Sequence, residues 1–584
     1  MKLSDIKSPA DIKNLTVGQL EDLAAQMREA ILFRTSHIGG HVSPNLGAVE
    51  IITAMHYVFD APKDKLVFDV SHQAFSHKML TGRAFGYLDP DKFYDIDEYT
   101  FPPESPEYDI FYAGHTSPAI SLSTGLAKAR ELAGDDYRIV ALIGDGSLSG
   151  GEAFEGLNVG GNVKGNFILI VNDNQMSIAE NFGAMYKGLQ RLRETNGTAG
   201  DNLFKAMGWD YVYLADGNNM QACIEALEKV KDTDRPIVVH VNTQKGEGYA
   251  PAEEFREEWH SHDPFIVATG ATRNPSDSPT YNGALCDFLK KKCAEEPNFL
   301  VVSSATPEEF GFMEAERRAA GKHFLDVDIA EQTAASVMAG AARGGATVVW
   351  PVAATFMQRA YDQILEDWVM DDSPALMPVL CTGVRGINDQ THLGFWDIPF
   401  LTSMPELVYL APANIEEFNA MLEWGTTQRK FKVALRVPTY SYEHADGPVD
   451  TDYSELNRFK VERNGSEVAV IAAGDYFVKG KQVAELLAKQ GINTTLINPR
   501  FVSGIDEDLL RRLEDNHSIV ATIEDGSIEG GFGQRIASFL GDSKMKVLNF
   551  GLAKRFENRY RTTEIEEKNG LLPEQIANRI LAAR

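Results

Sequence analysis

The amino-acid sequence predicts an α/β protein of three domains, each a largely parallel sheet flanked by helices. Short, wholly apolar segments of strand length alternate with helix-like segments along the chain, and two polar, proline-containing stretches interrupt this alternation. Strands that are apolar throughout are typical of parallel sheets covered by helices on both faces. A chain of 584 residues has room for about three or four domains of ordinary size.

The first predicted domain spans residues 1–268. It opens with an amphipathic helix, because apolar residues recur at helical spacing from Leu20 to Ile31. A helix-like segment at Gly151–Gly160 separates two of its strands, and the predicted strands are Ile139–Ile143, Phe167–Val171 and Ile237–Val241. The polar stretch Thr269–Thr280, with two prolines and a glycine, is interpreted as a linker.

The same alternation restarts twice, in a second predicted domain at 281–440 and a third at 453–584. A second polar stretch, Ser441–Asp452, separates them. The third domain is predicted to contain a helix at Gly480–Gln490. The predicted strands are Phe299–Val302, Thr347–Val352 and Met377–Cys381 in the second domain, and Val468–Ala472, Thr494–Ile497 and Ile519–Ile523 in the third.

Composition excludes several classes of protein. Hydrophobic residues make up 43% of the chain and charged residues 24%, which is ordinary globular usage and excludes fibrous and disordered proteins. The formal net charge of −28 disfavours nucleic acid and anionic membranes as partners, because an acidic surface repels phosphates. No apolar run reaches the roughly 18 residues of a membrane span, and the N-terminus lacks the apolar core of a signal peptide.

The four cysteines are too few and too scattered for a disulfide framework or a zinc site; they are Cys223, Cys286, Cys293 and Cys381. These features together lead us to expect a cytoplasmic protein whose partners are small molecules.

The most informative segment, Gly144–Gly151 (GDGSLSGG), directly follows a predicted strand and opens a helix. It is not a dinucleotide fingerprint, since Ser149 stands where that motif needs glycine, and no Lys-Ser or Lys-Thr follows as in a P-loop. Asp145 would repel a bare pyrophosphate. An acid at a phosphate-binding turn makes sense if a divalent cation lies between the two.

A second oxygen ligand for that cation is predicted at the end of the next strand. Asn174, in the segment Asn-Asp-Asn-Gln-Met, lies 29 residues after Asp145, which leaves room for one helix and one strand. The two side chains would then meet at the carboxyl edge of one sheet, where open α/β sheets bind ligands. The alternative is two unrelated turns rich in Gly, Asp and Asn.

This spaced pair resembles the thiamin diphosphate motif of the transketolase superfamily. Further segments over nearly the whole chain are similar to one branch, the 1-deoxy-D-xylulose-5-phosphate synthases. They are Gly39–His41, Asp69–Lys78, Gly114–Ser117, Lys245–Tyr249, Ile329–Gln332, Phe356–Gln363, Thr391–Gly394, Asn498–Val502 and Glu529–Gly531. The resemblance implies that the first domain binds the diphosphate and the second the pyrimidine of the cofactor. It also implies a homodimer.

The resemblance also implies roles for individual residues. Mg²⁺ would be held by Asp145, Asn174 and the carbonyl of Met176, and Glu331 would hydrogen-bond to the aminopyrimidine; the alternative for Glu331 is a helix-capping acid. Phe356 would stack on the pyrimidine, unless it is a core phenylalanine. The other implied cofactor contacts are His72, Gly114, His115, Thr116, Gly146, Ser147, Lys245 and Tyr249.

Three more histidines resemble those that line the family's substrate channel, namely His41, His260 and His392. Proton transfers there need groups that titrate near neutral pH, which makes histidine the suitable side chain. For any single histidine the alternative is a hydrogen-bonded core residue.

The half of the site that would bind the acceptor departs from the family pattern. Cys381 occupies the position of an arginine that helps to hold the acceptor's phosphate, and Ala353 that of a tyrosine. Asn388 replaces an acid, and Thr333 replaces the last residue of Ala-Glu-Gln-His. The segment between Ser177 and Gly208 is also shorter than in the family. Arg436 does match a phosphate-contacting arginine, and Arg385 could partly substitute for the missing one.

The expected function is therefore that of a thiamin diphosphate- and Mg²⁺-dependent carboligase resembling the synthases, which decarboxylate pyruvate and join the fragment to D-glyceraldehyde 3-phosphate. One alternative is transketolase-type ketol transfer between sugars, or a related carboligase with another acceptor. A second is a cofactor-free homologue that acts as a binding scaffold, which would need none of Asp145, Asn174 and Glu331.

Overall fold

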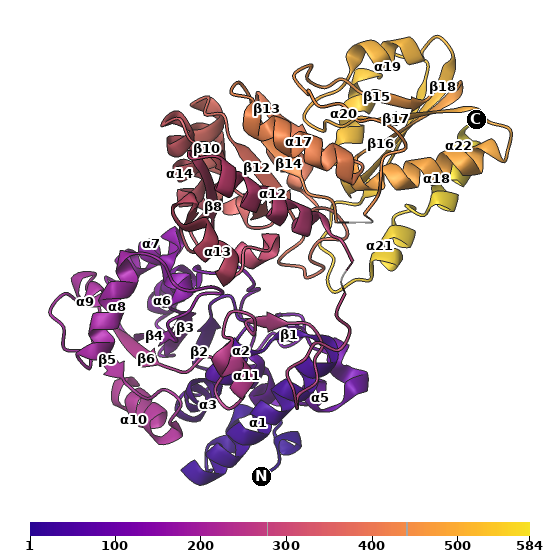
Figure 1. Ribbon diagram of the computed structural model, residues 1–584. Coiled ribbons are helices and arrows are strands. Elements are labelled where there is room, and N and C mark those ends of the chain that lie inside the picture. The colour runs from indigo at the N-terminus through magenta and orange to yellow at the C-terminus, as the bar shows by residue number, and fades with distance from the viewer. Residues whose placement is uncertain (277, 440–441) are drawn as a thin grey trace. The chain divides into compact units, whose positions relative to one another are not determined.

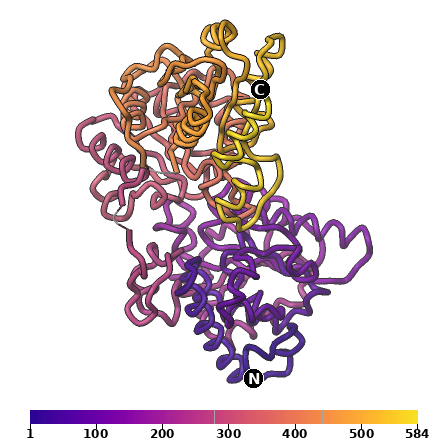
Figure 2. The backbone as a smooth tube through the Cα atoms, turned by 90° about the vertical axis from the view of Figure 1, so that its right-hand side faces the viewer, coloured from indigo at the N-terminus to yellow at the C-terminus, as the bar shows by residue number. Residues whose placement is uncertain are grey.

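The computed structural model describes residues 1–276, 278–439 and 442–584, and it divides into two compact units (Figure 1). The first unit comprises Met1–Asp277 and Asp328–Ala330, and the second comprises Ser278–Val327 and Glu331–Arg584. The tube in Figure 2 runs from the indigo N-terminus in the first unit to the yellow C-terminus in the second. Asp277 in the first predicted linker, Tyr440 at the end of the second predicted domain and Ser441 in the second predicted linker lie outside the described residues.

The first unit is built on a five-stranded sheet in which every strand pair is parallel. The strand order is β2 (Lys65–Phe68), β3 (Ile139–Gly144), β4 (Phe167–Asp173), β6 (Pro236–Asn242) and β5 (Asp210–Leu214). A separate antiparallel pair, β1 (Gly40–His41) with β7 (Ser261–His262), joins two distant loops. The predicted strands within 139–143, 167–171 and 237–241 are thereby confirmed.

Alternate side chains of β3 and β4 enter two separate cores, one on each face of the sheet. Val140 and Ile168 belong to one core, whereas Ala141 and Leu169 belong to the other, and all four are fully buried. A strand buried on both faces has no need of polar alternation, which is why its sequence is apolar throughout.

Helices cover both faces of this sheet, with α1, α3 and α10 contributing to the first core and α6 and α7 to the second. The helices of the unit are α1 (Val17–Ile38), α2 (Ser43–Gly47), α3 (Val49–Val58), α4 (Phe75–Lys78), α5 (Phe85–Leu88), α6 (Ala119–Ala133), α7 (Gly151–Gly160), α8 (Ala184–Glu194), α9 (Leu203–Ala206), α10 (Met220–Val230) and α11 (Ala250–Glu254). The predicted opening helix and the helix at Gly151–Gly160 are both present.

The second unit contains two further sheets. The seven-stranded sheet is entirely parallel and consists of β13 (Leu407–Leu410), β14 (Lys432–Arg436), β12 (Leu376–Leu380), β10 (Thr347–Val349), β8 (Phe299–Ser303) and β9 (Phe324–Asp326), with β11 (Val352–Ala353) beside β12. The five-stranded sheet consists of β15 (Lys460–Arg463), β17 (Thr494–Asn498), β16 (Glu467–Ala472), β18 (His517–Ser527) and β19 (Lys546–Leu552), and only its edge strand β15 is antiparallel.

The sheets of the second unit are also flanked by helices, so the three-sheet α/β fold class is confirmed. These helices are α12 (Tyr281–Glu295), α13 (Glu314–Ala320), α14 (Glu331–Arg343), α15 (Tyr361–Gln363), α16 (Asp397–Leu401), α17 (Ile415–Thr427), α18 (Phe477–Ala488), α19 (Glu507–Leu513), α20 (Phe532–Phe539), α21 (Thr562–Lys568) and α22 (Pro573–Ala583). The prediction of one strand over Thr347–Val352 was wrong, because the chain forms β10 and β11 there. Pro351 between them has no N–H to donate to a neighbouring strand.

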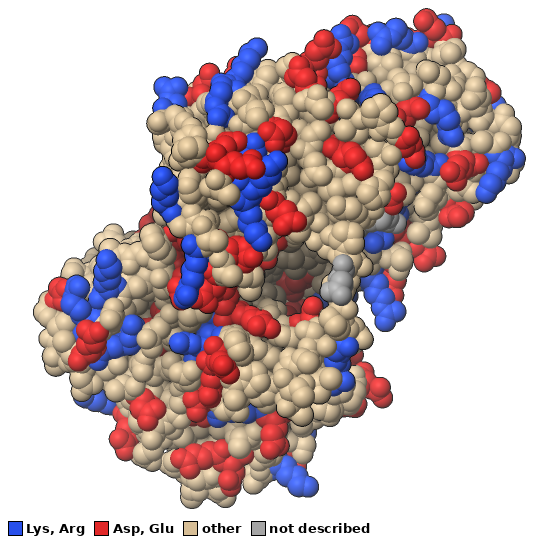
Figure 3. All heavy atoms as spheres, viewed as in Figure 1, with Lys and Arg blue, Asp and Glu red and all other residues tan. Residues whose placement is uncertain are grey.

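Acidic and basic side chains are interspersed on the face shown in Figure 3. The acidic side chains do not gather into a single acidic patch on that face. Within the described residues, no helix combines the length and the apolar character that crossing a membrane requires.

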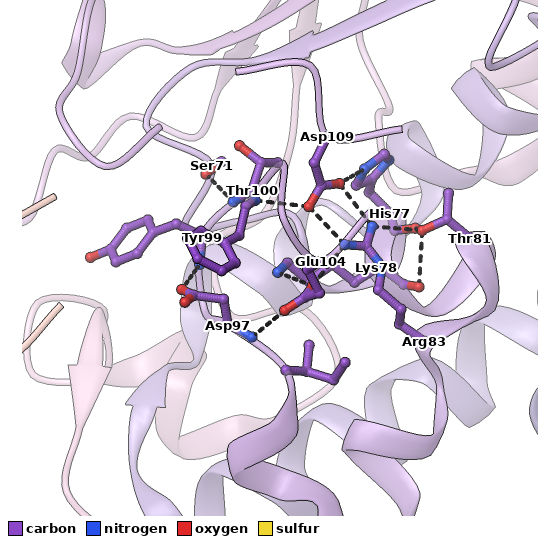
Figure 4. A network of polar contacts seen from close by, with 12 residues as sticks. Ser71, His77, Lys78, Thr81, Arg83, Asp97, Tyr99, Thr100, Glu104 and Asp109 are labelled. Atoms are coloured by element: carbon purple, nitrogen blue, oxygen red, sulfur yellow. Dashed lines mark hydrogen bonds and ion pairs between the residues drawn. The ribbon is translucent and has the colours of Figure 1, made fainter. Parts of the chain in front are cut away.

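A buried polar network fixes the loop that follows the 3-10 turn Pro90–Asp95 (Figure 4). Asp109 accepts hydrogen bonds from Arg83 and from Nε2 of His77, and Glu104 accepts from Lys78 and Arg83, at distances of 2.7–2.9 Å. His77 Nδ1 lies 2.9 Å from Nε2 of His56. Since Nε2 of His77 donates to Asp109, its Nδ1 is an acceptor, and Nε2 of His56 must carry the donated proton.

Both histidines of this network are buried as neutral groups, so we predict that the protein loses stability as the pH falls from 7.5 to 5.5. Burial lowers the pKa of His56 well below its ordinary value and lowers the pKa of His77 as well. The unfolded chain then binds more protons than the native chain below about pH 6.5, which costs about 1.4 kcal/mol per pH unit for each group.

Urea unfolding of wild type and His56→Gln at the two pH values tests this prediction. Glutamine can still donate to His77 but does not titrate, so this variant should lose less stability on acidification than wild type. An equal loss in both proteins would show that His56 does not carry the pH dependence.

Candidate active site

The carboxyl edge of the first sheet brings together the residues predicted to bind a metal. Strands β3 and β4 are adjacent and in register, with Gly144 opposite Asn172, so Asp145 and Asn174 follow neighbouring strand ends. Oδ1 of Asp145 accepts a hydrogen bond of 3.4 Å from the backbone N–H of Asn174, and Oδ1 of Asn174 accepts one of 3.1 Å from Met176. Three oxygen-bearing residues thus lie at one point of the edge.

The electrostatics of this point fit a divalent cation. Burial raises the pKa of the Asp145 carboxyl well above its ordinary value, and the neighbouring carboxylate of Asp173 raises it further. Asp173 itself is compensated by His240, whose Nε2 lies 2.8 Å away, and by Arg193. Within the part of the chain that the structure describes, the donors to the Asp145 carboxylate are neutral, namely the N–H of Asn174 and the amide of Asn181 at 2.7 Å. A bound Mg²⁺ would supply the missing counter-charge.

Two loops predicted to contact the diphosphate pack against each other beside Asp145. Ser117 donates through Oγ to the carbonyl of Ser147 at 3.0 Å, and a Cβ on Gly150 would come within 2.1 Å of that Oγ. Gly146 is equally confined, because a Cβ there would lie 2.9 Å from Cα of Ser177. Gly114 is buried, whereas His115 and Thr116 in the same loop are partly exposed.

A cluster of three histidines lies in the same unit. The ring centroids of His41, His72 and His260 are 5.0–5.3 Å apart. The β1–β7 pair and a hydrogen bond from Val42 N–H to the His260 carbonyl hold two of them together. Burial lowers the pKa of His260 well below its ordinary value, and the positive charge of Lys245 contributes to the shift.

Lys245 follows β6 and is almost fully buried. Its ammonium group donates to the carbonyl of Ser177 at 2.7 Å, and its charge acts on both Asp145 and His260. Lys245 therefore lies close enough to Asp145 and to His260 for its charge to act on both. Tyr249, predicted as a cofactor contact, is 8% exposed, packs against Trp259 and donates to the carbonyl of Val267.

The second unit positions the residues predicted to meet the pyrimidine. Glu331 is the first residue of α14 and is 2% exposed. Burial raises its pKa, Oε2 accepts no hydrogen bond within the described residues, and Nη1 of Arg359 lies 3.5 Å from that atom. A buried carboxyl with an open acceptor position fits a ligand that presents a hydrogen-bond donor.

Phe356 and His392 contact each other within this unit, with ring centroids 5.6 Å apart in an edge-to-face arrangement. The imidazole of His392 is oriented by Thr391 Oγ1, 2.8 Å from Nδ1, and by Asp389 at 3.5 Å. Asp389 directly follows Asn388, the position at which the family pattern has an acid.

The positions that depart from the family pattern are dispersed. Cys381 adopts a positive φ of 51°, and burial raises its pKa, with a further contribution from the charge of Glu309. Ala353 is buried in β11, and Thr333 is exposed on α14. Asn388 is exposed and donates to the carbonyl of Tyr560, and Arg385 is exposed as well.

Arg436, predicted to contact a phosphate, is buried between two carboxylates. Its Nε and Nη2 donate to Asp397 at 2.7 and 3.2 Å, and its Nη1 donates to Asp525. Only 3% of its surface is exposed. A third acid, Asp475, lies close enough to Asp525 that burial and this neighbour raise the pKa of Asp475 to about 7.

Sequence reasoning missed two residues that shape the site. Asn181 donates to Asp145, and Glu98 bonds to His41. Both lie in loops without a motif of their own, and only the tertiary fold brings them to their partners. The sequence likewise indicates no role for the buried carboxylate of Asp173 or for the partly buried Glu309.

Comparison with known proteins identifies the family. The family profile described as 1-deoxy-D-xylulose-5-phosphate synthase matches residues 3–200 and 195–243, that of the transketolase pyrimidine binding domain matches 277–443, and that of the transketolase C-terminal domain matches 457–576.

Curated relatives extend this match over the whole chain. The chain is 35% identical to a 1-deoxy-D-xylulose-5-phosphate synthase of Thermomicrobium roseum, over 100% of this chain and 98% of the relative. Proteins of the same name from Pelotomaculum thermopropionicum and Symbiobacterium thermophilum are 34% and 35% identical, each over 99% of this chain and over 96% and 94% of the relative. The chain therefore belongs to the 1-deoxy-D-xylulose-5-phosphate synthase family.

Proposed function

We propose that the protein is a thiamin diphosphate- and Mg²⁺-dependent synthase that decarboxylates pyruvate and joins the resulting two-carbon fragment to an aldehyde. The observation that carries the proposal is the buried, incompletely compensated carboxylate of Asp145 beside Asn174, in a chain of this family. Membership of the family makes the protein a transferase of aldehyde or ketone residues that acts on small molecules, and it implies thiamin diphosphate.

Within this proposal each group of residues has a distinct task. When bound, thiamin diphosphate would supply the carbanion chemistry that decarboxylation of a 2-keto acid requires. Asp145, Asn174 and the Met176 carbonyl would hold Mg²⁺ on the diphosphate, and Glu331 would accept a hydrogen bond from the pyrimidine. His41, His260 and His392 would move protons to and from the substrate, and His72 would contact the cofactor.

The acceptor is proposed to be an aldehyde whose phosphate, where it has one, is weakly held. A bidentate arginine–phosphate contact is among the stronger polar contacts in proteins. Cys381 cannot make it, and Arg436 is already neutralised by Asp397 and Asp525. Glu309, near Cys381, adds an acid whose pKa is raised to about 7 by burial and by Glu331.

We further propose that the protein works as a cytoplasmic homodimer, as the resemblance to the synthases implies. Its net charge of −28 favours a soluble protein that does not bind nucleic acid or anionic lipid. Light scattering at several protein concentrations would measure the assembly state.

The first prediction from this proposal concerns the metal. Asp145→Asn should abolish binding of thiamin diphosphate with Mg²⁺, because the variant loses the one anionic ligand at the site. Titration calorimetry measures the affinity. The control is Asp60→Asn, which changes an acid of the first unit that is far in the sequence from the residues of the carboxyl edge. Wild-type affinity in Asp145→Asn would contradict the metal assignment.

The second prediction separates cofactor activation from cofactor binding. Glu331→Ala should leave the affinity for thiamin diphosphate largely intact but lower kcat by several orders of magnitude, because the lost hydrogen bond is needed for activation rather than docking. Exchange of the cofactor's C2 proton with deuterium, followed by NMR, measures activation directly. If C2 exchange is as fast as in wild type, Glu331 is only a helix-capping acid.

The third prediction concerns the acceptor. Cys381→Arg should lower the KM for D-glyceraldehyde 3-phosphate about ten- to a hundredfold, the equivalent of about 1.5–3 kcal/mol for a regained charged hydrogen bond. The KM for unphosphorylated glyceraldehyde should change little. Cys381→Ser controls for loss of the thiol. A micromolar KM for the phosphorylated aldehyde in wild type would show that its phosphate is held elsewhere.

A further inference from the structure

Glu98 forms a close pair with His41 in the first unit. Its Oε1 lies 2.8 Å from both the backbone N–H and the ring Nδ1 of His41. The approach leaves no room for a side chain at Gly40, where a Cβ would lie 2.8 Å from the same oxygen and where φ is +118°. The glycine of the Gly39–His41 segment is therefore required for the carboxylate to reach the imidazole.

The carboxylate determines which nitrogen of His41 carries a proton. Burial opposes the charge on Glu98, but the electrostatic attraction of His41 and its hydrogen bonds outweigh burial and lower the pKa of Glu98 to about 2. An ionised carboxylate can only accept hydrogen bonds, so Nδ1 must be the donor. The other nitrogen, Nε2, is then the one available to exchange protons.

Residues on both sides of Glu98 in the chain, Asp97 and Thr100, are held by hydrogen bonds (Figure 4). The N–H of Asp97 donates to Glu104 at 2.6 Å, and the N–H of Thr100 donates to Oγ of Ser71 at 2.8 Å. Glu104 is in turn bound by the buried cations Lys78 and Arg83. The loop on both sides of Glu98 is thus fastened to the segment that carries His72.

His41 is likewise fixed relative to the other histidines. The side-chain amide of Asn45 donates to the carbonyls of His41 and His72, at 2.9 and 2.7 Å. The backbone positions of both residues are therefore set independently of Glu98. What Glu98 adds is the orientation and the protonation pattern of one ring.

We propose that Glu98 is a positioning residue that holds His41 with its proton on Nδ1, so that Nε2 serves the proton transfers of the reaction. This role rests on the proposed function, since it assigns a task to His41 within it. In this role Glu98 acts through His41.

The variants Glu98→Ala and Glu98→Gln separate the two contributions of the carboxylate. Alanine removes both hydrogen bonds, so kcat should fall about tenfold to a hundredfold, as for the loss of a partner that orients a functional histidine. Glutamine keeps an oxygen that can accept both bonds, so it should lose less. The KM for pyruvate and the affinity for the cofactor should stay near wild type in both, and Glu107→Gln, an exposed acid on the same loop, is the matched control.

A double-mutant cycle tests whether Glu98 acts through His41. In a His41→Gln background, Glu98→Ala should cause no further loss of kcat, because its only partner in catalysis is gone. Additive losses would overturn the proposal. So would a wild-type kcat in Glu98→Ala, or an equal loss of kcat in Glu107→Gln.

The ¹⁵N spectrum of the histidine-labelled full chain without cofactor gives a readout that needs no turnover. The His41 resonances, assigned by their absence in His41→Gln, should place the proton on Nδ1 in wild type and Glu98→Gln, and shift it toward Nε2 in Glu98→Ala. An unchanged pattern in Glu98→Ala would overturn the proposal. Failure of wild type to decarboxylate pyruvate would instead refute the proposed function, so the two failures are distinguishable.

Discussion

The chemistry of the first unit depends on how buried negative charge is compensated at the carboxyl edge of one parallel sheet. Two acids lie there on neighbouring segments. Asp173 accepts hydrogen bonds from His240 and Arg193, whereas the hydrogen bonds that Asp145 accepts within the described residues come from amide groups, with Lys245 acting on it through its charge. An isolated buried carboxylate is costly, and proteins keep one where a cation or proton completes it. The carboxyl edge of the sheet thus carries one acid, Asp145, that lacks the hydrogen bonds from a histidine and an arginine that Asp173 accepts.

The loops around this edge are rigid because their charged side chains form hydrogen bonds and ion pairs within the protein. Asp69 accepts from the N–H groups of Ser117 and Ala119, which ties the Gly114–Ser117 loop to the end of β2. The network of Arg83, Glu104 and Asp109 does the same for the loop bearing Glu98. Breaking one partner of such a buried network leaves an unpaired charge and costs about 3–5 kcal/mol. The histidine cluster thus sits on segments whose positions are strongly determined.

The sequence predicted the parts of this arrangement that follow from periodicity and spacing. Apolar runs revealed β3, β4 and β6 because these strands are buried on both faces. Strand β5 (Asp210–Leu214) was missed because it is a half-buried edge strand with polar and aromatic residues, and β2 because it is short and begins with Lys65. The Asp145–Asn174 pair could be predicted since adjacent parallel strands end at the same edge. Glu98 and Asn181 could not, because their partners are 57 and 36 residues away in the chain and no rule of spacing connects them.

In the second unit, an arginine retained from the family pattern is bound by acids of the same chain. Arg436 keeps the position that the family pattern implies, yet its N–H donors are directed at Asp397 and Asp525, and Tyr409 donates to Asp397 as well at 2.5 Å. A guanidinium shared by two carboxylates presents no net positive charge to a third anion. For a phosphate dianion to bind there it would have to displace one carboxylate, which would then be buried without a partner. The identity of one residue therefore does not decide whether an anion binds there, because the charges of the acids around it count as well.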